Sequence, residues 1–124
     1  MKPTRAMSPP GTYFVTFTTW QRRRLFVVEP YARLFLKTLY GYKKQGRFQL
    51  HEFVVMPEHV HLMLTPAVDI TLERAMQFIK GGYSHLWVST SIGTGRFGKE
   101  DSRITAFVTR RILKGTGIIF IRTR

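Results

Sequence analysis

Two histidines separated by one residue are the strongest chemical signal in this sequence. His59 and His61 stand in the segment FVVMPEHVHLMLTP, residues 53–66. Side chains two positions apart leave the same face of a β-strand, so the two imidazoles project together while the apolar residues between them face the other way. Imidazoles placed in this way are able to share one metal ion. A pair of half-exposed structural histidines, one of them bonded to a backbone carbonyl, has the same spacing.

The segments that must position these histidines follow the order strand, helix, strand, strand, helix. Dense β-branched and aromatic residues or strict alternation predict the strands, and apolar residues at helical spacing predict the helices. The order predicts an α+β fold, a ferredoxin-like split βαβ antiparallel sheet with two helices and an incomplete C-terminal part. The predicted elements are strands at residues 12–20, 47–56 and 59–65 and helices at residues 29–45 and 70–86.

The chain divides into three parts. Residues 1–10 contain three prolines and are expected to form an extended arm. Residues 11–86 hold the predicted sheet and helices. Residues 87–124 are rich in Ser, Thr, Gly and Arg and keep neither the helical nor the strand period, so we expect an atypical, poorly packed basic tail in place of the closing strand.

Composition limits the function classes. With 124 residues, 44% of them hydrophobic, the chain suits one compact domain. Twenty Lys and Arg against seven Asp and Glu give a net charge of +13, which favours nucleic acid first and an anionic membrane surface second. The absence of cysteine excludes disulfides, thiolate zinc sites and cysteine nucleophiles. The sequence has neither a spanning apolar run nor an apolar stretch typical of a secretory signal, so we expect a cytoplasmic protein with no membrane association.

Basic residues provide candidate DNA contacts. Arg22, Arg23 and Arg24 follow Trp20, an arrangement that suits phosphate contacts beside a stacked base and equally suits a solvated turn. Lys80 is a further candidate. Residues 84–124 contain eight basic and two acidic residues, so nearly half of the excess charge lies in the tail.

The segment around the histidines, M-P-x-H-V-H-L, resembles the histidine–hydrophobe–histidine (HUH) motif of single-tyrosine transposases, and of the REP-associated tyrosine transposases in particular. The stretch PGTYFVTFTTWQRRRLF is similar to that family's opening strand and basic turn. LERAMQFIKGGYSH is similar to its second helix, with Lys80-Gly81 at the family's Lys-Gly step. The resemblance covers roughly residues 9–86, and Glu58 stands where the family more often has Asn or Asp.

The resemblance implies a specific activity, DNA transposition. Such proteins bind single-stranded DNA folded into hairpins, as monomers or homodimers, and act on chromosomal DNA. His59 and His61, with an amide oxygen, would hold Mg²⁺ or Mn²⁺, which polarises the scissile phosphate. A tyrosine then attacks the phosphorus to give a 5′-phosphotyrosine that a 3′-hydroxyl resolves. That tyrosine and an amide residue four positions later share one face of a later helix.

This chain departs from the family where the nucleophile belongs. No tyrosine follows Tyr83, no glutamine follows Gln77, and the sequence contains no asparagine. Tyr83 is a weak candidate, since its place in the Lys-Gly helix favours packing or DNA contact. We therefore expect this product to lack a catalytic residue and to leave DNA uncleaved.

The tail resembles the missing C-terminal region read in another frame. Shifted codons that take the last base of one residue and the first two of the next, from Phe97 onward, are able to encode WQRGFTDHRIRDAEDFEGHRNYIHQNP. That string resembles the family's C-terminal helix, which ends in Tyr-Ile-His-x-Asn-Pro. The tyrosine codon would span Ile118 and Ile119, and the asparagine codon Arg122 and Thr123.

Two other function classes remain open on the residues alone. One is a non-catalytic basic DNA-binding module in which His59 and His61 are structural. The other is a small metal-binding hydrolase that combines the histidines with Glu58 or Asp101. Only the hydrolase would cleave DNA without a covalent adduct.

Overall fold

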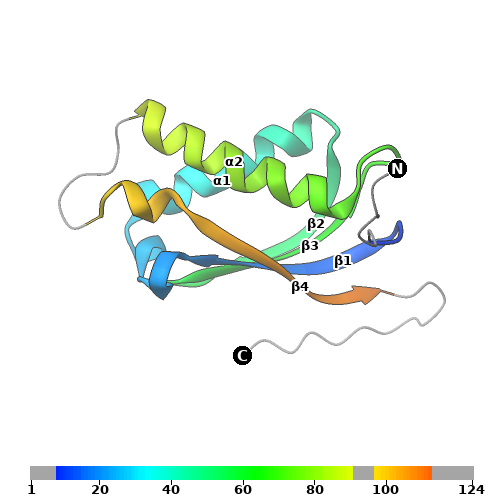
Figure 1. Ribbon diagram of the computed structural model, residues 1–124, viewed down its shortest axis with the longest axis horizontal. Coiled ribbons are helices and arrows are strands. Elements are labelled where there is room, and N and C mark those ends of the chain that lie inside the picture. Colours follow the sequence, from blue (N-terminus) through cyan, green and yellow to red (C-terminus); the bar gives the residue numbers. More distant parts are fainter. Residues whose placement is uncertain (1–7, 91–96, 113–124) are drawn as a thin grey trace, which may run out of the picture.

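The computed structural model describes residues 8–90 and 97–112, which form a four-stranded antiparallel sheet with two helices on one face (Figure 1). The strand order is β2-β3-β1-β4, so β3 lies between β1 and β2 as in a split βαβ arrangement. The α+β fold class is confirmed. In chain order the elements are β1 (Thr12–Thr19), α1 (Glu29–Lys44), β2 (Phe48–Val55), β3 (His59–Pro66), α2 (Leu72–Thr90) and β4 (Ile104–Ile112), with short 3₁₀ segments at Trp20–Arg22, Leu25–Val27 and Lys99–Ser102.

The hydrophobic core lies between the sheet and the two helices. On β3 the burial alternates, so that Val60, Leu62 and Leu64 are buried and the histidines between them are only partly so. Each helix contributes one apolar stripe at the spacing that the sequence predicts. The helices therefore occupy one face of the sheet and leave the histidines on the other. The stripes consist of Tyr31, Leu34, Phe35 and Leu39 on α1 and Leu72, Ala75, Ile79, Tyr83 and Trp87 on α2.

The structure corrects the expectation for the tail within the residues that it describes. Helix α2 continues to Thr90, past the expected boundary at residue 86, and β4 pairs antiparallel with β1 as the fourth strand. Most of β4 is exposed, with Ile104 its one buried residue. Backbone hydrogen bonds to β1 hold an edge strand without an amphipathic pattern, so no periodic signal marks it. The proposed shifted codons at residues 118–123 and most of the N-terminal arm lie outside the described residues.

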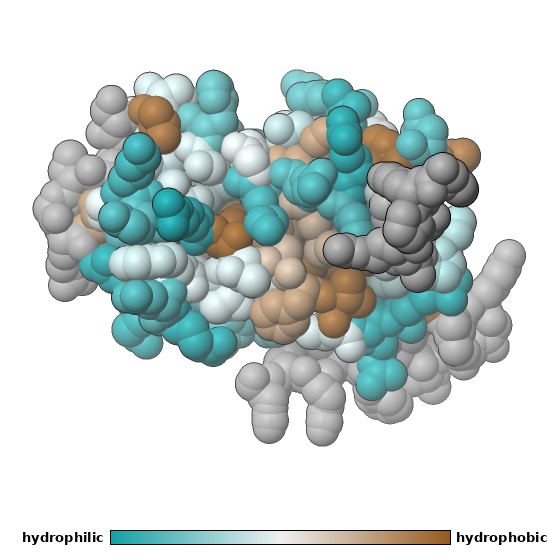
Figure 2. Space-filling model, in the orientation of Figure 1, coloured by the Kyte–Doolittle hydropathy of each residue, from teal (hydrophilic) through white to brown (hydrophobic). Residues whose placement is uncertain are grey.

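The face of the molecule seen in Figure 2 is predominantly polar. In the view of Figure 2 hydrophilic side chains cover most of the described surface, and hydrophobic residues appear in small groups. Over residues 8–90 and 97–112, no helix combines the length and the apolar character needed to cross a bilayer.

A pair of adjacent glycines in α2 tests the packing of the two helices. A methyl group added at Gly82 would lie 2.6 Å from a ring carbon of Tyr42, whose ring stacks on Phe78, whereas one added at Gly81 would have no neighbour within 4 Å. We expect Gly81→Ala to stabilise the fold by roughly 0.5–1 kcal/mol through helix propensity. Gly82→Ala should destabilise it by about 1–3 kcal/mol through overpacking. Urea unfolding followed by circular dichroism measures both, and equal stabilisation by the two variants would contradict this packing.

Candidate metal centre

The two histidine side chains lie together on the sheet face opposite the helices. Their ring centroids are 4.6 Å apart and the ring planes meet at 78°. Both residues are partly buried, since strand alternation directs them away from the core that their neighbours Val60 and Leu62 enter. The expected same-face arrangement is therefore present, and neither ring is sealed in hydrocarbon.

Two threonines of β1 stand directly across from the histidines. In the antiparallel register Thr16 pairs with His61 and Thr18 with His59. Thr16 Oγ1 and His61 Nδ1 are 3.0 Å apart and form a hydrogen bond. This bond fixes the orientation of the His61 ring and leaves its Nε2 as the nitrogen available to a ligand.

Three buried polar atoms at this place have no hydrogen-bond partner among the described residues. They are Thr18 Oγ1, His59 Nδ1 and His61 Nε2. Buried polar atoms are paired in the great majority of cases, and a cluster of unpaired ones indicates an ion or water that the protein atoms alone do not supply. Two adjacent imidazole rings, each with a buried nitrogen that makes no hydrogen bond to the described residues, fit a metal ion.

The protonation of His61 also suits metal binding. Burial lowers the pKa of His61, and the neighbouring imidazole of His59 lowers it further. A lower pKa favours the neutral imidazole, which is the form that ligates metals. In the described part of the chain no group of three or more His, Asp or Glu side chains is arranged as a complete metal site, so the pair needs further donors.

Glu58 connects the histidines to the basic turn. Its Oε2 lies 3.5 Å from His59 Nδ1 and 3.3 Å from Arg22 Nη2. The structure thus brings Glu58, one of the two acids considered for a hydrolase, to the histidines. The other acid, Asp101, is 1% exposed, forms an ion pair with Arg23 at 3.1 Å and accepts a hydrogen bond from the Gly98 amide.

Backbone hydrogen bonds hold the basic turn against the β2–β3 turn. The amide of Thr19 donates to the carbonyl of Glu58 at 3.0 Å, and the amide of Phe26 donates to the carbonyl of Pro57 at 2.9 Å. Because Pro57 and Glu58 directly precede His59, the segment between Thr19 and Phe26 lies beside the metal-centre candidate.

The three arginines of this segment differ. Arg22 and Arg24 are exposed, and the aromatic Trp20 is partly buried. Arg23 does not fit the solvated-turn interpretation, because it pairs with buried Asp101 and its guanidinium lies 4.8 Å from the centre of the Phe97 ring. Sequence reasoning missed this pair, since no local pattern links residues so distant in the chain.

Tyr83 and Lys80 belong to the helical layer. Tyr83 is 0% exposed and its ring contacts Phe26, Phe35 and Trp87. Burial raises the pKa of its phenol well above the usual range, which disfavours a phenolate nucleophile. Lys80 is exposed beside Ser84 and Arg103 at a shallow hollow between α2 and β4. The structure brings neither residue to the histidines.

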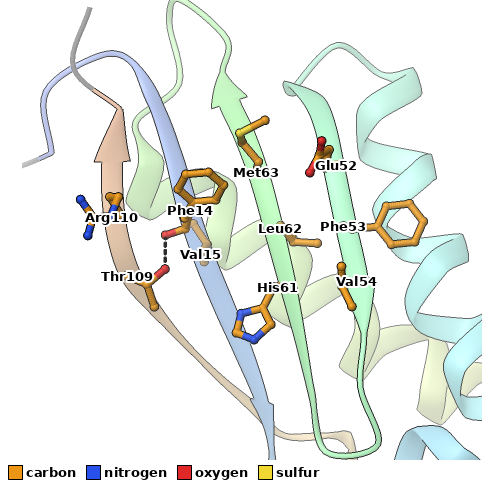
Figure 3. Close-up of a pocket in the computed structure, with 10 residues that line it drawn as sticks. All are labelled: Phe14, Val15, Glu52, Phe53, Val54, His61, Leu62, Met63, Thr109 and Arg110. Atoms are coloured by element: carbon orange, nitrogen blue, oxygen red, sulfur yellow. Dashed lines mark hydrogen bonds between the residues drawn. The ribbon is translucent and has the colours of Figure 1, made fainter. Parts of the chain in front are cut away.

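A pocket of about 220 Å³ lies beside His61 on the sheet (Figure 3). Figure 3 shows His61 and Met63 on its near side, with the helices behind the sheet. The Thr109 hydroxyl donates to the Phe14 carbonyl at 3.0 Å and joins two of the lining residues, one on β4 and one on β1. Phe14 was not predicted as a site residue, although the alternation along β1 places it on the same sheet face as the histidines. The lining residues are Phe14, Val15, Glu52, Phe53, Val54, His61, Leu62, Met63, Thr109 and Arg110.

Comparisons with known proteins agree with this architecture. Residues 11–94 match a family model described as IS200-like transposase. Among solved structures the chain is similar to a proposed transposase from Deinococcus radiodurans R1, with a TM-score of 0.62 and 18% identity over 89% of this chain and 87% of that one. It is also similar to a REP-associated tyrosine transposase bound to a REP hairpin, with a TM-score of 0.57 and 20% identity over 90% of this chain and 64% of that one. No curated protein matches the chain. At these identities the two structures show a shared fold.

Proposed function

Because the chain belongs to the IS200-like transposase family, we propose that it binds single-stranded DNA folded into a hairpin and that His59 and His61 hold a divalent cation beside a phosphate of that DNA. The observation that carries this proposal is the pair of imidazole rings, 4.6 Å apart on the sheet face opposite the helices, each with a buried nitrogen that makes no hydrogen bond to the described residues. A bound Mg²⁺ or Mn²⁺ supplies Lewis-acid polarisation of a phosphate oxygen.

The protein's own residues have separate roles in this proposal. His61 presents Nε2 while its Nδ1 stays bonded to Thr16, so the ring is oriented before any ligand arrives. Glu58 holds Arg22 beside His59, which keeps a guanidinium close to the proposed phosphate position. Arg24 adds a second exposed cation on the same segment. A hairpin as partner is supported by the similar transposase, which was solved with a REP hairpin.

We propose further that this 124-residue chain binds DNA without cutting it. The sequence has no tyrosine after Tyr83, and the Tyr83 hydroxyl is enclosed by aromatic side chains of the core. A phosphotyrosine would require this ring to leave the core. The second candidate function is a non-catalytic DNA-binding module. It differs from the metal-dependent hairpin binding proposed above only in that His59 and His61 hold no metal.

The origin of the missing nucleophile is proposed to be a change of reading frame near Phe97. The family match ends at residue 94, three residues before the point from which shifted codons are able to encode a family-like helix with tyrosine and asparagine. The gene's nucleotide sequence after residue 83 tests this directly. If its alternative frame does not encode that string, the proposal is wrong.

Fluorescence anisotropy with a labelled hairpin oligonucleotide tests the proposed function. We expect Mn²⁺ to tighten binding on the order of tenfold, a coupling of about 1–3 kcal/mol between cation and DNA. The double variant His59→Ala, His61→Ala should lose that effect and keep the metal-independent part. Equal binding with Mn²⁺ and with a chelator would favour the non-catalytic module. Cleavage without an adduct would indicate a hydrolase, and an adduct at Tyr83 would overturn the proposed loss of the nucleophile.

The exposed arginines give a separate prediction about salt. Arg24→Ala should weaken hairpin binding at every sequence tested. Because one phosphate contact is lost, the steepness of the fall of log K with log salt should decrease by about one. Arg33→Ala on α1 is the matched control, because Arg33 is exposed but pairs with Glu29 in the helical layer. The measurement is a salt titration of affinity for the three proteins. Equal slopes for wild type and Arg24→Ala would remove Arg24 from the interface.

A further inference from the structure

We infer that the Thr18 hydroxyl is a neutral oxygen ligand of the cation held by His59 and His61, an inference that rests on the proposed metal centre.

Register and burial place Thr18 at the site. Thr18 and His59 are directly paired residues on adjacent antiparallel strands, and their side chains therefore leave the same face with Cβ atoms roughly 4.5–5.5 Å apart. Thr18 is 8% exposed, so hydrogen bonds to bulk water do not readily replace the protein partner that its hydroxyl lacks.

The two threonines opposite the histidines are unlike each other. Thr16 Oγ1 is satisfied by His61 Nδ1 at 3.0 Å. Thr18 Oγ1 has no hydrogen-bond partner among the described residues, and His59 Nδ1 across from it makes no hydrogen bond either, although Glu58 Oε2 lies 3.5 Å from that nitrogen. If Thr18 and His59 had only a structural role, we would expect a hydrogen bond between their side chains like the one between Thr16 and His61. Two atoms without a hydrogen bond on directly paired residues are explained by one ligand that both contact.

The chemistry of the chain favours an oxygen donor here. Mg²⁺ and Mn²⁺ prefer oxygen ligands, and threonine hydroxyls bind Mg²⁺ in other phosphate-handling proteins. The family resemblance implies a neutral amide oxygen as the third ligand, whereas this sequence has no asparagine and no glutamine after Gln77. Thr18 supplies a neutral oxygen from β1 without adding charge.

The test is titration of the full-length protein with Mn²⁺ alone, with free Mn²⁺ measured by electron paramagnetic resonance, together with thermal melts in chelator. Thr18→Val keeps the branched shape and removes the hydroxyl. We expect it to weaken Mn²⁺ binding by about tenfold or more, while its Tm in chelator stays equal to or rises above that of the wild type, because no internal bond is lost. Thr18→Ser should retain wild-type affinity. Thr105→Val is the matched control, since Thr105 lies across from Thr18 on β4 and is exposed.

The outcomes separate this inference from the proposed function. If Thr18→Val binds Mn²⁺ as the wild type does while His59→Ala does not, the metal centre stands and the role of Thr18 is wrong. If Thr18→Val melts clearly lower in chelator, the hydroxyl has a partner within the fold, and the inference is also overturned. If the wild type and His59→Ala are alike, with no binding in either, both claims fail.

Discussion

A chain translated in the alternative frame from about residue 97 should form a covalent adduct with a hairpin oligonucleotide in Mn²⁺, whereas the 124-residue product should form none. The shifted codons supply a tyrosine across Ile118 and Ile119 and an asparagine four positions later. On a helix this spacing puts the phenol and the amide oxygen on one face, where both are able to meet one cation. Removal of an enzyme nucleophile costs on the order of 10⁶ in kcat, so the contrast is between turnover and none.

Denaturing electrophoresis of the protein with a labelled oligonucleotide measures the adduct. The control is the frame-restored chain with that tyrosine replaced by phenylalanine, which should bind the hairpin and form no adduct. A second control is His61→Ala in the frame-restored chain. This variant still contains the tyrosine but lacks a proposed metal ligand, and it should form no adduct. An adduct formed by the 124-residue chain would contradict the account, as would a restored chain that binds but never reacts.

Loss of the buried ion pair between the basic turn and the segment after α2 should have the largest effect on stability. Asp101 is 1% exposed, while the Arg23 side chain is 33% exposed. Arg23→Ala leaves a buried carboxylate without its partner and should cost about 3–5 kcal/mol. Asp101→Asn should cost less, because the remaining guanidinium reaches solvent and the amide oxygen still accepts the Gly98 hydrogen bond. Urea unfolding measures the asymmetry.

The double variant Arg23→Met, Asp101→Asn is the matched control for that pair. It removes both charges, so it should be more stable than Arg23→Ala. A small cost for Arg23→Ala would show that the segment around Asp101 does not pack on the domain in solution. That result would leave the histidine site intact, because His59 and His61 are positioned by β1, β2 and β3.

The elements from β1 to α2 were predictable because each has a strong local pattern. The alternation in β3 and the apolar spacing in α1 arise because both elements bury one face in the same hydrophobic core. Strand β4 was not predictable, since most of its residues are exposed and backbone pairing with β1 specifies it. The end of α2 was missed for a related reason, as Trp87 packs on Tyr31 and extends the buried stripe past residue 86.

The candidate site likewise contains some residues that local sequence patterns predict and others that they do not. His59 and His61 follow from spacing within one strand, and the match of residues 11–94 to the IS200-like family confirms the resemblance noted in the sequence. The threonines across from them depend on the register between β1 and β3, which no residue pattern in either strand fixes alone. Arg23 resembled its neighbours in sequence and differs from them only because a distant acid, Asp101, is buried beside it.

Pulsed electron paramagnetic resonance of Mn²⁺ bound to the full-length protein with a hairpin oligonucleotide tests whether the two histidines hold the cation beside the DNA. We expect nitrogen couplings from imidazole that are lost in the double variant His59→Ala, His61→Ala, together with a phosphorus coupling that appears only when DNA is present. A spectrum with phosphorus coupling and no protein nitrogen would mean that the cation follows the DNA alone. The two histidines would then have no part in holding it.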